Sequence, residues 1–454
     1  MKTTRCFTTM ALAVAALVMS CNDDEKNKPV AVTGVELNAS TLSLLVGTDT
    51  TLVATVTPLD AENTLVEWNS SDPEIASVVD GKITAVAVGG PVTVTVTTND
   101  GGFTATCDVT VTAPPETFVS PEDVTVTTIC GSVGTANGTL QRAQFGMAQG
   151  IAVASSGIIY VGDNVNYRVQ KVDVAGDNVS TLAGPPPAMF IMMAPGGYIN
   201  ATGEDARFSN LIAIALDAAG NIYASDLENS AIRKITPAGV VTTFAGGDPK
   251  QVGYADATGT AARFNKPYGI AVDGDGNVYV ADSENYRVRK ITPAGAVTTL
   301  AGSGAQGTSD GNGTEAQFSG LHGLAVDRAG NIYVADGSRV RKITPAGVVT
   351  TLAGEGEGFV DGNGAEARFG SVADIAVDAN GYLYVTDMSN NCVRRITPSG
   401  VVTTLAGTGT AGSNDNTGDA ATFNHPAGID IDAEGNLYLL DASTCKLRKI
   451  TFNN

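Results

Sequence analysis

The sequence predicts an all-β protein in two parts, a β-sandwich followed by a six-bladed β-propeller that its own N-terminal strand closes. Residues 31–113 alternate apolar and polar positions and are rich in Val and Thr, which is the period-two pattern of half-buried strands. Residues 122–454 then repeat one unit, and repeats of four short strands indicate a propeller. Each unit opens on a phenylalanine: Phe145, Phe208, Phe264, Phe318, Phe369 and Phe423.

Composition supports a folded chain of more than one domain. The 454 residues are 43% hydrophobic and 16% charged, which is too apolar for a disordered chain and long enough for several domains. The formal net charge is −20. Because a polyanion repels phosphate backbones, we expect no nucleic-acid partner.

The N-terminus has the pattern of a secretory signal over residues 1–20. Lys2 and Arg5 precede an apolar run at residues 7–19, and this run is too short to span a bilayer. Residues 17–21 then resemble a bacterial lipobox, which is cleaved just before a cysteine. The resemblance implies that Cys21 carries a lipid that anchors the chain to the membrane. The alternative is an ordinary secreted protein in which Cys21 is incidental.

The tether, residues 21–30, begins with the acidic run Asn22-Asp23-Asp24-Glu25. This run resembles the export signal that sends Bacteroidetes lipoproteins to the outer face of the cell. We therefore expect a cell-envelope lipoprotein of the outer membrane that is exposed at the surface. The alternative for the run is a plain solvated tether.

The first folded part covers residues 31–113. Its segments Val66–Asp72 and Gly81–Ala85 resemble the group 2 bacterial Ig-like domain, a common spacer and adhesive unit of bacterial surface proteins. We expect Trp68, the one tryptophan of the sequence, to lie in the core rather than to form a sugar-stacking platform. The Pro-containing residues 114–121 form a short, stiff linker.

The second part, residues 122–454, contains six units, and a complete unit has four predicted strands. In the third unit these are 269–273, 278–282, 287–291 and 297–301. The amino-acid sequence at residues 329–336 and 341–354 closely resembles NHL repeats. That resemblance implies a six-bladed propeller, and most NHL propellers are interaction platforms.

The sixth unit ends at residues 449–451 without its fourth strand, and a matching segment stands at residues 126–131. We expect this segment to complete the last blade, because open sheet edges invite unwanted pairing. A tight turn at Pro293-Ala294 would pair Tyr286 with Ala301. The equivalent pair in the last blade is Cys445 and Cys130, so we predict a Cys130–Cys445 disulfide that locks the ring. Two free thiols are the alternative, and a one-residue shift of register would exclude the bond.

Catalytic signals are weak. The sequence has no G-x-S-x-G elbow, phosphate loop or clustered Cys/His pattern, and it has only two histidines, His322 and His425. Some propellers similar to NHL proteins, such as the peptide α-amidating and virginiamycin lyases, use histidines and a metal in the funnel. His322 and His425 stand at non-equivalent positions, so we predict no catalytic residue, metal or cofactor. The alternative is a metal-dependent lyase or hydrolase.

Residues that recur in every unit indicate structure, and residues that differ between units indicate a binding site. We expect the recurring arginines to pair with neighbouring acids, and the Asn or Asp eight residues before each phenylalanine to initiate turns. The position before the inner-strand glycine varies instead. There Gln149, Tyr268 and His322 predict a patch at one channel mouth that holds a sugar or a peptide end. The insertion at residues 185–197 is either an interface or packing.

These features predict a lipid-anchored envelope protein whose propeller binds a protein, peptide or glycan without catalysis. A lyase or hydrolase predicts histidines and carboxylates converging at one mouth. A third possibility, a structural spacer, predicts no surface patch that departs from the repeat.

Overall fold

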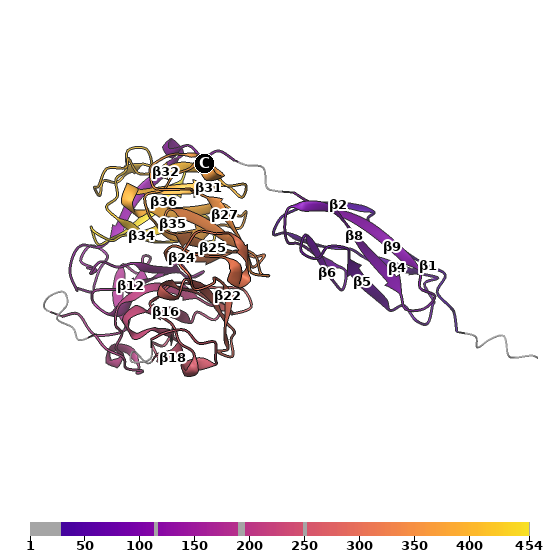
Figure 1. Ribbon diagram of the computed structural model, residues 1–454, viewed down its shortest axis with the longest axis horizontal. Coiled ribbons are helices and arrows are strands. Elements are labelled where there is room, and N and C mark those ends of the chain that lie inside the picture. The colour runs from indigo at the N-terminus through magenta and orange to yellow at the C-terminus, as the bar shows by residue number, and fades with distance from the viewer. Residues whose placement is uncertain (1–28, 113–116, 189–195, 248–251, 454) are drawn as a thin grey trace, which may run out of the picture. The chain divides into compact units, whose positions relative to one another are not determined.

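The computed structural model describes residues 29–112, 117–188, 196–247 and 252–453, and it is built of strands and single-turn 3-10 helices (Figure 1). The chain divides into two compact units between Thr112 and Ala113. The predicted signal, Cys21 and residues 189–195 of the insertion lie outside the described residues. Within the described ranges, no helix has the length and apolar character needed to cross a membrane.

The first unit consists of three small sheets with a shared core. Their orders are β1-β4, β2-β9-β8-β5 and β3-β7-β6, with β2 and β9 parallel. The strands are β1 (Gly34–Leu37), β2 (Thr41–Leu45), β3 (Asp49–Thr51), β4 (Ala54–Thr57), β5 (Val66–Ser70), β6 (Ala76–Val79), β7 (Lys82–Ala85), β8 (Gly89–Thr98) and β9 (Thr104–Thr112).

Alternation along β8 and β9 builds this core. Val94 and Val96 of β8 are fully buried, as are Cys107 and Val109 of β9. Trp68 packs against the same buried side chains, which confirms its prediction as a core residue.

The second compact unit has six sheets in the described part of the chain. The four strands predicted for the third repeat, between residues 269 and 301, are all present. Five sheets run from inner to outer strand in chain order, and three sheets carry a further two-residue strand on the outer edge. The first three sheets contain β11 (Gly150–Val153), β12 (Ile158–Asp163), β13 (Arg168–Asp173) and β14 (Asn178–Ala183); β15 (Leu211–Leu216), β16 (Ile222–Asp226), β17 (Ala231–Ile235) and β18 (Val241–Gly246); and β19 (Pro267–Val272), β20 (Val278–Asp282), β21 (Arg287–Ile291) and β22 (Val297–Ala301). The fourth and fifth sheets contain β24 (Leu321–Val326), β25 (Ile332–Asp336), β26 (Arg339–Ile343) and β27 (Val348–Ala353) with β23 (Gly311–Asn312); and β29 (Val372–Val377), β30 (Leu383–Asp387), β31 (Cys392–Ile396) and β32 (Val401–Ala406) with β28 (Gly362–Asn363). The sixth sheet contains β34 (Pro426–Ile431), β35 (Leu437–Asp441) and β36 (Lys446–Phe452) with β10 (Val124–Cys130) and β33 (Asn416–Thr417).

The six inner strands close into a ring. Each inner strand contacts the inner strands of the two neighbouring sheets, in the order β11, β15, β19, β24, β29, β34 and back to β11. Single-turn 3-10 helices lie in the connections: η1 (Pro121–Asp123), η2 (Gly203–Asp205), η3 (Leu227–Asn229), η4 (Gly259–Ala261), η5 (Ser283–Asn285), η6 (Gly313–Glu315), η7 (Gly364–Glu366) and η8 (Met388–Asn390). The second unit is therefore a six-bladed propeller.

The N-terminal strand β10 completes the last blade, as the sequence predicts. It pairs antiparallel with β36, and its Val124 and Val126 are fully buried in the core of that blade. The second half of the predicted linker also belongs to this unit. The backbone N–H of Thr117 donates to the Tyr382 hydroxyl at 2.9 Å, and Arg395 donates to the Thr117 carbonyl at 2.6 Å.

The recurring residues form one buried network per blade. Arg341 is fully buried and lies 2.7 Å from Asp336, which ends the second strand, and 5.3 Å from the ring of Phe318. Its second nitrogen contacts Asp310 at 2.8 Å. Asp310 also accepts from the backbone N–H of Thr351 on the outer strand, so its predicted role in initiating a turn is wrong. The structural role predicted for the arginines is confirmed.

The predicted register of Cys130 and Cys445 is wrong. Cys130 pairs with Leu447, two residues beyond Cys445, and both cysteines are buried free thiols. Two features cause the shift. Both are seen in the third blade. Its last turn is one residue longer than predicted, since Thr292 pairs with Ala296. A β-bulge then follows between the two strands that this turn joins, β21 and β22. Cα atoms two residues out of register are about 7–8 Å apart, beyond the reach of a disulfide.

Candidate functional site

The three residues predicted at a channel mouth lie together. The hydroxyl of Tyr268, on β19, donates to the side-chain oxygen of Gln149 at 3.1 Å. The ring of His322, on β24, lies 5.1 Å from the ring of Tyr268, and its Nδ1 lies 3.2 Å from the carbonyl oxygen of Val372. Residues from the first, third and fourth blades therefore meet across the axis, as expected from their position before the inner-strand glycine.

These three side chains close this end of the channel rather than opening it. The space left beside Gln149, Tyr268 and the neighbouring Ile212 and Ala373 is about 20 Å³, which is room for about one water molecule. Burial and the nearby charge of Asp374 raise the pKa of Tyr268 to about 12. Its hydroxyl consequently keeps its proton and its hydrogen bond to Gln149 at neutral pH. The three residues thus meet at a narrow end of the channel, and their binding of a sugar or a peptide end stays a prediction.

Glycine makes the narrow end possible. A Cβ at Gly269 would collide with the backbone oxygen of His322, and a Cβ at Gly323 would collide with Asp374. Gly428 likewise lies against the backbone oxygen of Gln149. Inner strands of neighbouring blades can approach this closely only where a side chain is absent.

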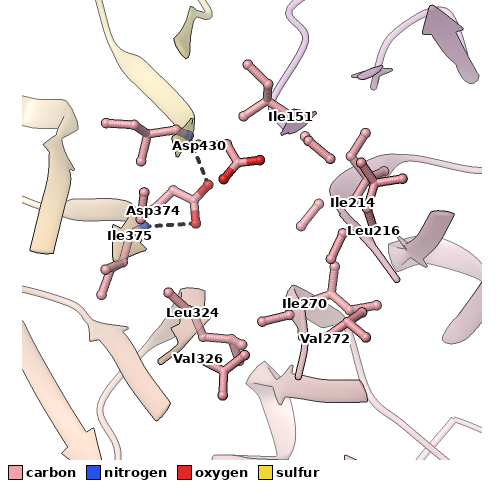
Figure 2. A pocket seen from close by; sticks show the side chains of 18 of the residues that line it. Ile151, Ile214, Leu216, Ile270, Val272, Leu324, Val326, Asp374, Ile375 and Asp430 are labelled. Carbon is pink, nitrogen blue, oxygen red and sulfur yellow. Dashed lines mark hydrogen bonds between the residues drawn. The ribbon is translucent and has the colours of Figure 1, made fainter. Parts of the chain in front are cut away.

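Beyond the closed end the channel widens into a cavity of about 230 Å³ lined by all six inner strands. Most of the side chains that line it are aliphatic, with Ile151, Ile214, Ile270 and Leu324 around the axis (Figure 2), while polar atoms form the larger part of its surface. The charged side chains in this lining are two carboxylates, Asp374 on β29 and Asp430 on β34, and Figure 2 shows them on one side of the channel.

Each carboxylate joins its own blade to the next one. Asp374 accepts from the backbone N–H of Ile375 at 2.9 Å and from that of Ile429, in the next blade, at 3.1 Å. Asp430 accepts from Ile431 at 2.8 Å and from Val153, in the first blade, at 2.7 Å. The pair therefore bridges the two interfaces on either side of the last blade.

Enclosure by the channel disfavours the charged form of both groups. Burial raises the pKa of Asp374 to about 7, and the neighbouring charge of Asp430 adds to this effect. Burial also raises the pKa of Asp430 to about 6, and Asp432 adds to it. The backbone donors oppose these shifts without cancelling them. Both groups therefore titrate close to neutral pH.

This predicts a pH-dependent stability difference between the native chain and the Asp374→Asn/Asp430→Asn variant. A raised folded pKa stabilises the folded state below the unfolded value near 4, and this contribution is lost as pH rises through about 6 and 7. The free energy of unfolding of the native chain, minus that of the variant, should fall by about 2 kcal/mol between pH 5 and pH 8, with water in the channel reducing the full effect. Urea unfolding at the two pH values measures it. A constant difference would contradict these shifts.

The far end of the channel is open. The cavity shares Val326 and Val377 with a depression of about 500 Å³, and shares Val272 and Val326 with another of about 470 Å³. The turns that follow the inner strands form both depressions. The charged residues that line them are mostly acidic: Asp273, Asp275, Asp327, Asp378, Asp432 and Glu434, against Lys290 and Arg328. The candidate site is therefore a one-ended funnel with an acidic mouth.

His425 does not join this site. Its Nδ1 lies 2.9 Å from the side-chain oxygen of Asn424, on an exposed loop. Among the residues that the structure describes, no three His, Cys, Asp or Glu side chains come together in an arrangement fit to hold a metal. The convergent set expected of a metal-dependent lyase or hydrolase is thus not seen in the described ranges.

Asp374 and Asp430 were not predicted from the sequence, although the repeat carries a signal for both. The position of Asp374 holds Gly or Ala in the other five units, and that of Asp430 holds Ala in the other five. Both break the repeat on an inner strand, one and three positions beyond the varying position that holds Gln149, Tyr268 and His322 in other units.

Comparison with known proteins agrees with this architecture. Residues 31–109 match the bacterial Ig-like domain (group 2), and residues 145–172 and 264–291 match the NHL repeat. The chain thus carries an Ig-like domain followed by an NHL-type propeller.

The chain is similar to two curated proteins over part of their length. It is 27% identical over 268 residues to protein SUPPRESSOR OF QUENCHING 1 of Arabidopsis thaliana, covering 45% of this chain and 25% of that one. It is 26% identical over 299 residues to human NHL repeat-containing protein 2, covering 58% of this chain and 40% of that one. It therefore spans well under half the length of either relative.

Among solved structures, an auxiliary nutrient binding protein from Bacteroides thetaiotaomicron shares the fold. The TM-score is 0.56 at 18% identity, over 94% of this chain and 99% of that one. At this identity the likeness establishes the fold.

Proposed function

We propose that this chain is a lipid-anchored cell-envelope protein of the outer membrane, exposed at the surface, that binds a protein, peptide or glycan in its propeller without catalysis. The observation that carries the proposal is the funnel, which is closed by Gln149, Tyr268 and His322, open at the other end, and marked by two carboxylates that break the repeat. A pure spacer has no need of such asymmetry. The shared fold with a nutrient binding protein supports the binding role.

Binding in the funnel predicts that blocking it abolishes capture of ligands. Val326 lines the channel and both depressions of the mouth, so Val326→Trp should fill the passage. The full chain, applied to glycan and peptide arrays, should capture ligands that the Val326→Trp variant loses by at least about tenfold in affinity.

The matched control is Val348→Trp, which places the same side chain on the exposed outer strand of the same blade. It should retain every ligand. Capture that survives Val326→Trp and is lost in Val348→Trp would move the site to the outside of the propeller. An array without any captured ligand would contradict the proposed function.

The lipid anchor has its own test. Cys21→Ser should abolish incorporation of a labelled fatty acid and release the protein from the membrane fraction, because acyl chains supply the anchoring. Cys6→Ser, within the predicted signal, is the control and should stay labelled. Loss of the protein to protease added to intact cells checks surface exposure. Unchanged labelling of Cys21→Ser would refute the lipoprotein assignment.

A further inference from the structure

The two channel carboxylates are part-buried and differ from the fully buried acids of the propeller in having no basic partner. Asp226, Asp282 and Asp336 each lie 2.7 Å from a fully buried arginine. No ion pair joins Asp374 or Asp430 to a basic side chain of the described residues. A carboxylate removed from bulk water without a counter-charge is costly. The cavity is therefore complementary to a cation.

The hydrogen bonds already made restrict the kind of cation. Each of the four carboxylate oxygens accepts one backbone N–H. A carboxylate has about four acceptor positions, so each group keeps about two of them for a ligand. A planar guanidinium prefers two free oxygens of one carboxylate in a fork. A compact ammonium, with three rotatable donors, is better suited to two half-occupied carboxylates.

The walls specify the rest of the ligand. Beside the carboxylates the channel presents Ile151, Ile214, Ile270 and Leu324 (Figure 2). These aliphatic side chains favour contact with a methylene chain. The route in is also matched to a cation, because acids predominate at the open mouth and the chain carries a net charge of −20, which steers cations toward it.

We propose that the funnel binds an aliphatic primary ammonium group, with its charged end between Asp374 and Asp430 and its methylene chain along the aliphatic side chains. This inference rests on the proposed function and names its ligand class. Two sources share this chemistry, the lysine side chain of a peptide and a free diamine.

The test is calorimetric titration of the full chain with two ammonium probes, Nα-acetyl-lysine methylamide and 1,5-diaminopentane. The neutral control probe is Nα-acetyl-norleucine methylamide, which has a methyl group in place of the methylene-ammonium end. At pH 8 the ammonium probes should bind at least about tenfold more tightly than the neutral one. Tighter binding of the lysine derivative would assign the peptide source, and tighter binding of the diamine the free amine. Equal binding of the neutral probe, or no binding of either ammonium probe, would overturn the inference.

Two further measurements separate charge recognition from shape. The Asp374→Asn/Asp430→Asn variant should lose about tenfold in affinity for the ammonium probes, whereas Asp275→Asn at the mouth should lose less than about twofold. The second measurement uses the native chain without substitutions. Its affinity for the ammonium probes should rise from pH 5 to pH 8, and binding should release protons. The titratable groups that interact electrostatically with the pair are Tyr268 and Asp432. A pH-independent affinity would overturn the inference.

Failure of this inference differs from failure of the proposed function. If array ligands depend on Val326 while the ammonium probes do not bind, the ligand class is wrong and the channel site stands. If no ligand depends on Val326, the channel site itself is wrong.

Discussion

Val126→Asp is expected to destabilise the propeller by at least about 4 kcal/mol. Val126 is fully buried in the core of the last blade, beside Phe423 and Ile450. The substitution loses the burial of a valine, about 1.5–3 kcal/mol, and places a carboxylate in a fully buried position, which costs several kcal/mol more. Because β10 closes the ring, the loss affects the whole propeller rather than one edge.

Urea unfolding of the full chain measures this effect and contains its own reference. Trp68 is the one tryptophan of the sequence and lies in the sandwich, so its fluorescence follows that unit, while circular dichroism follows both. The dichroism transition of the propeller should move to lower urea, and the fluorescence transition should stay.

The matched control is Thr127→Asp, the adjacent residue, which is exposed and pairs with Lys449. It adds the same charge on the opposite face of the strand and should change stability by no more than about 0.5 kcal/mol. Equal effects of the two substitutions would show that β10 is not packed into the last blade.

Asp336→Ala is the second large expected effect, a loss of about 3–5 kcal/mol. The substitution leaves Arg341 charged and fully buried after removing its closest partner, at 2.7 Å. Breaking a buried pair in this way is far more costly than replacing both partners. It also removes the acceptor of the backbone N–H groups of Ser319 and Gly320.

Asp310→Ala removes the other partner of the same arginine and serves as the control. The Asp310 side chain is 47% exposed, and an exposed ion pair contributes about 0–1 kcal/mol. The loss should therefore be about 1 kcal/mol in the same urea titration. A loss as large as that of Asp336→Ala would contradict the burial on which the comparison rests.

The propeller architecture was predictable because the same strand pattern recurs in each of the six units. Six marker phenylalanines define the units, and all six are fully buried. The missing fourth strand of the last unit, together with its copy at residues 126–131, was enough to predict how the ring closes. The prediction of the propeller therefore does not depend on the correct interpretation of any one residue.

The register of the outer strand pair was not predictable at the same level. A bulge in the third blade skips one residue between Val288 and Arg289 and their partners, and nothing in the local pattern marks it. With the longer turn, it displaces Cys130 from Cys445 by two positions. The pairing of two particular residues depends on every residue between them and the turn, whereas the recognition of six repeats does not.

The candidate site was predicted in part. Comparing one position between units found Gln149, Tyr268 and His322, which do meet. That they close the channel depends on the reach of the Tyr268 side chain across the axis, which a sequence does not give. Asp374 and Asp430 required the same comparison at every inner-strand position, and the burial that raises the pKa of each appears only once the six strands are in a ring.

A crystal structure of the full chain with a ligand captured on the arrays tests the account most directly. We predict density for the intact ligand inside the channel, between the closed end at Tyr268 and the mouth at Val326, in contact with Asp374 and Asp430. Density on the outer strands, or a cleaved ligand, would contradict a non-catalytic binding site in the propeller channel.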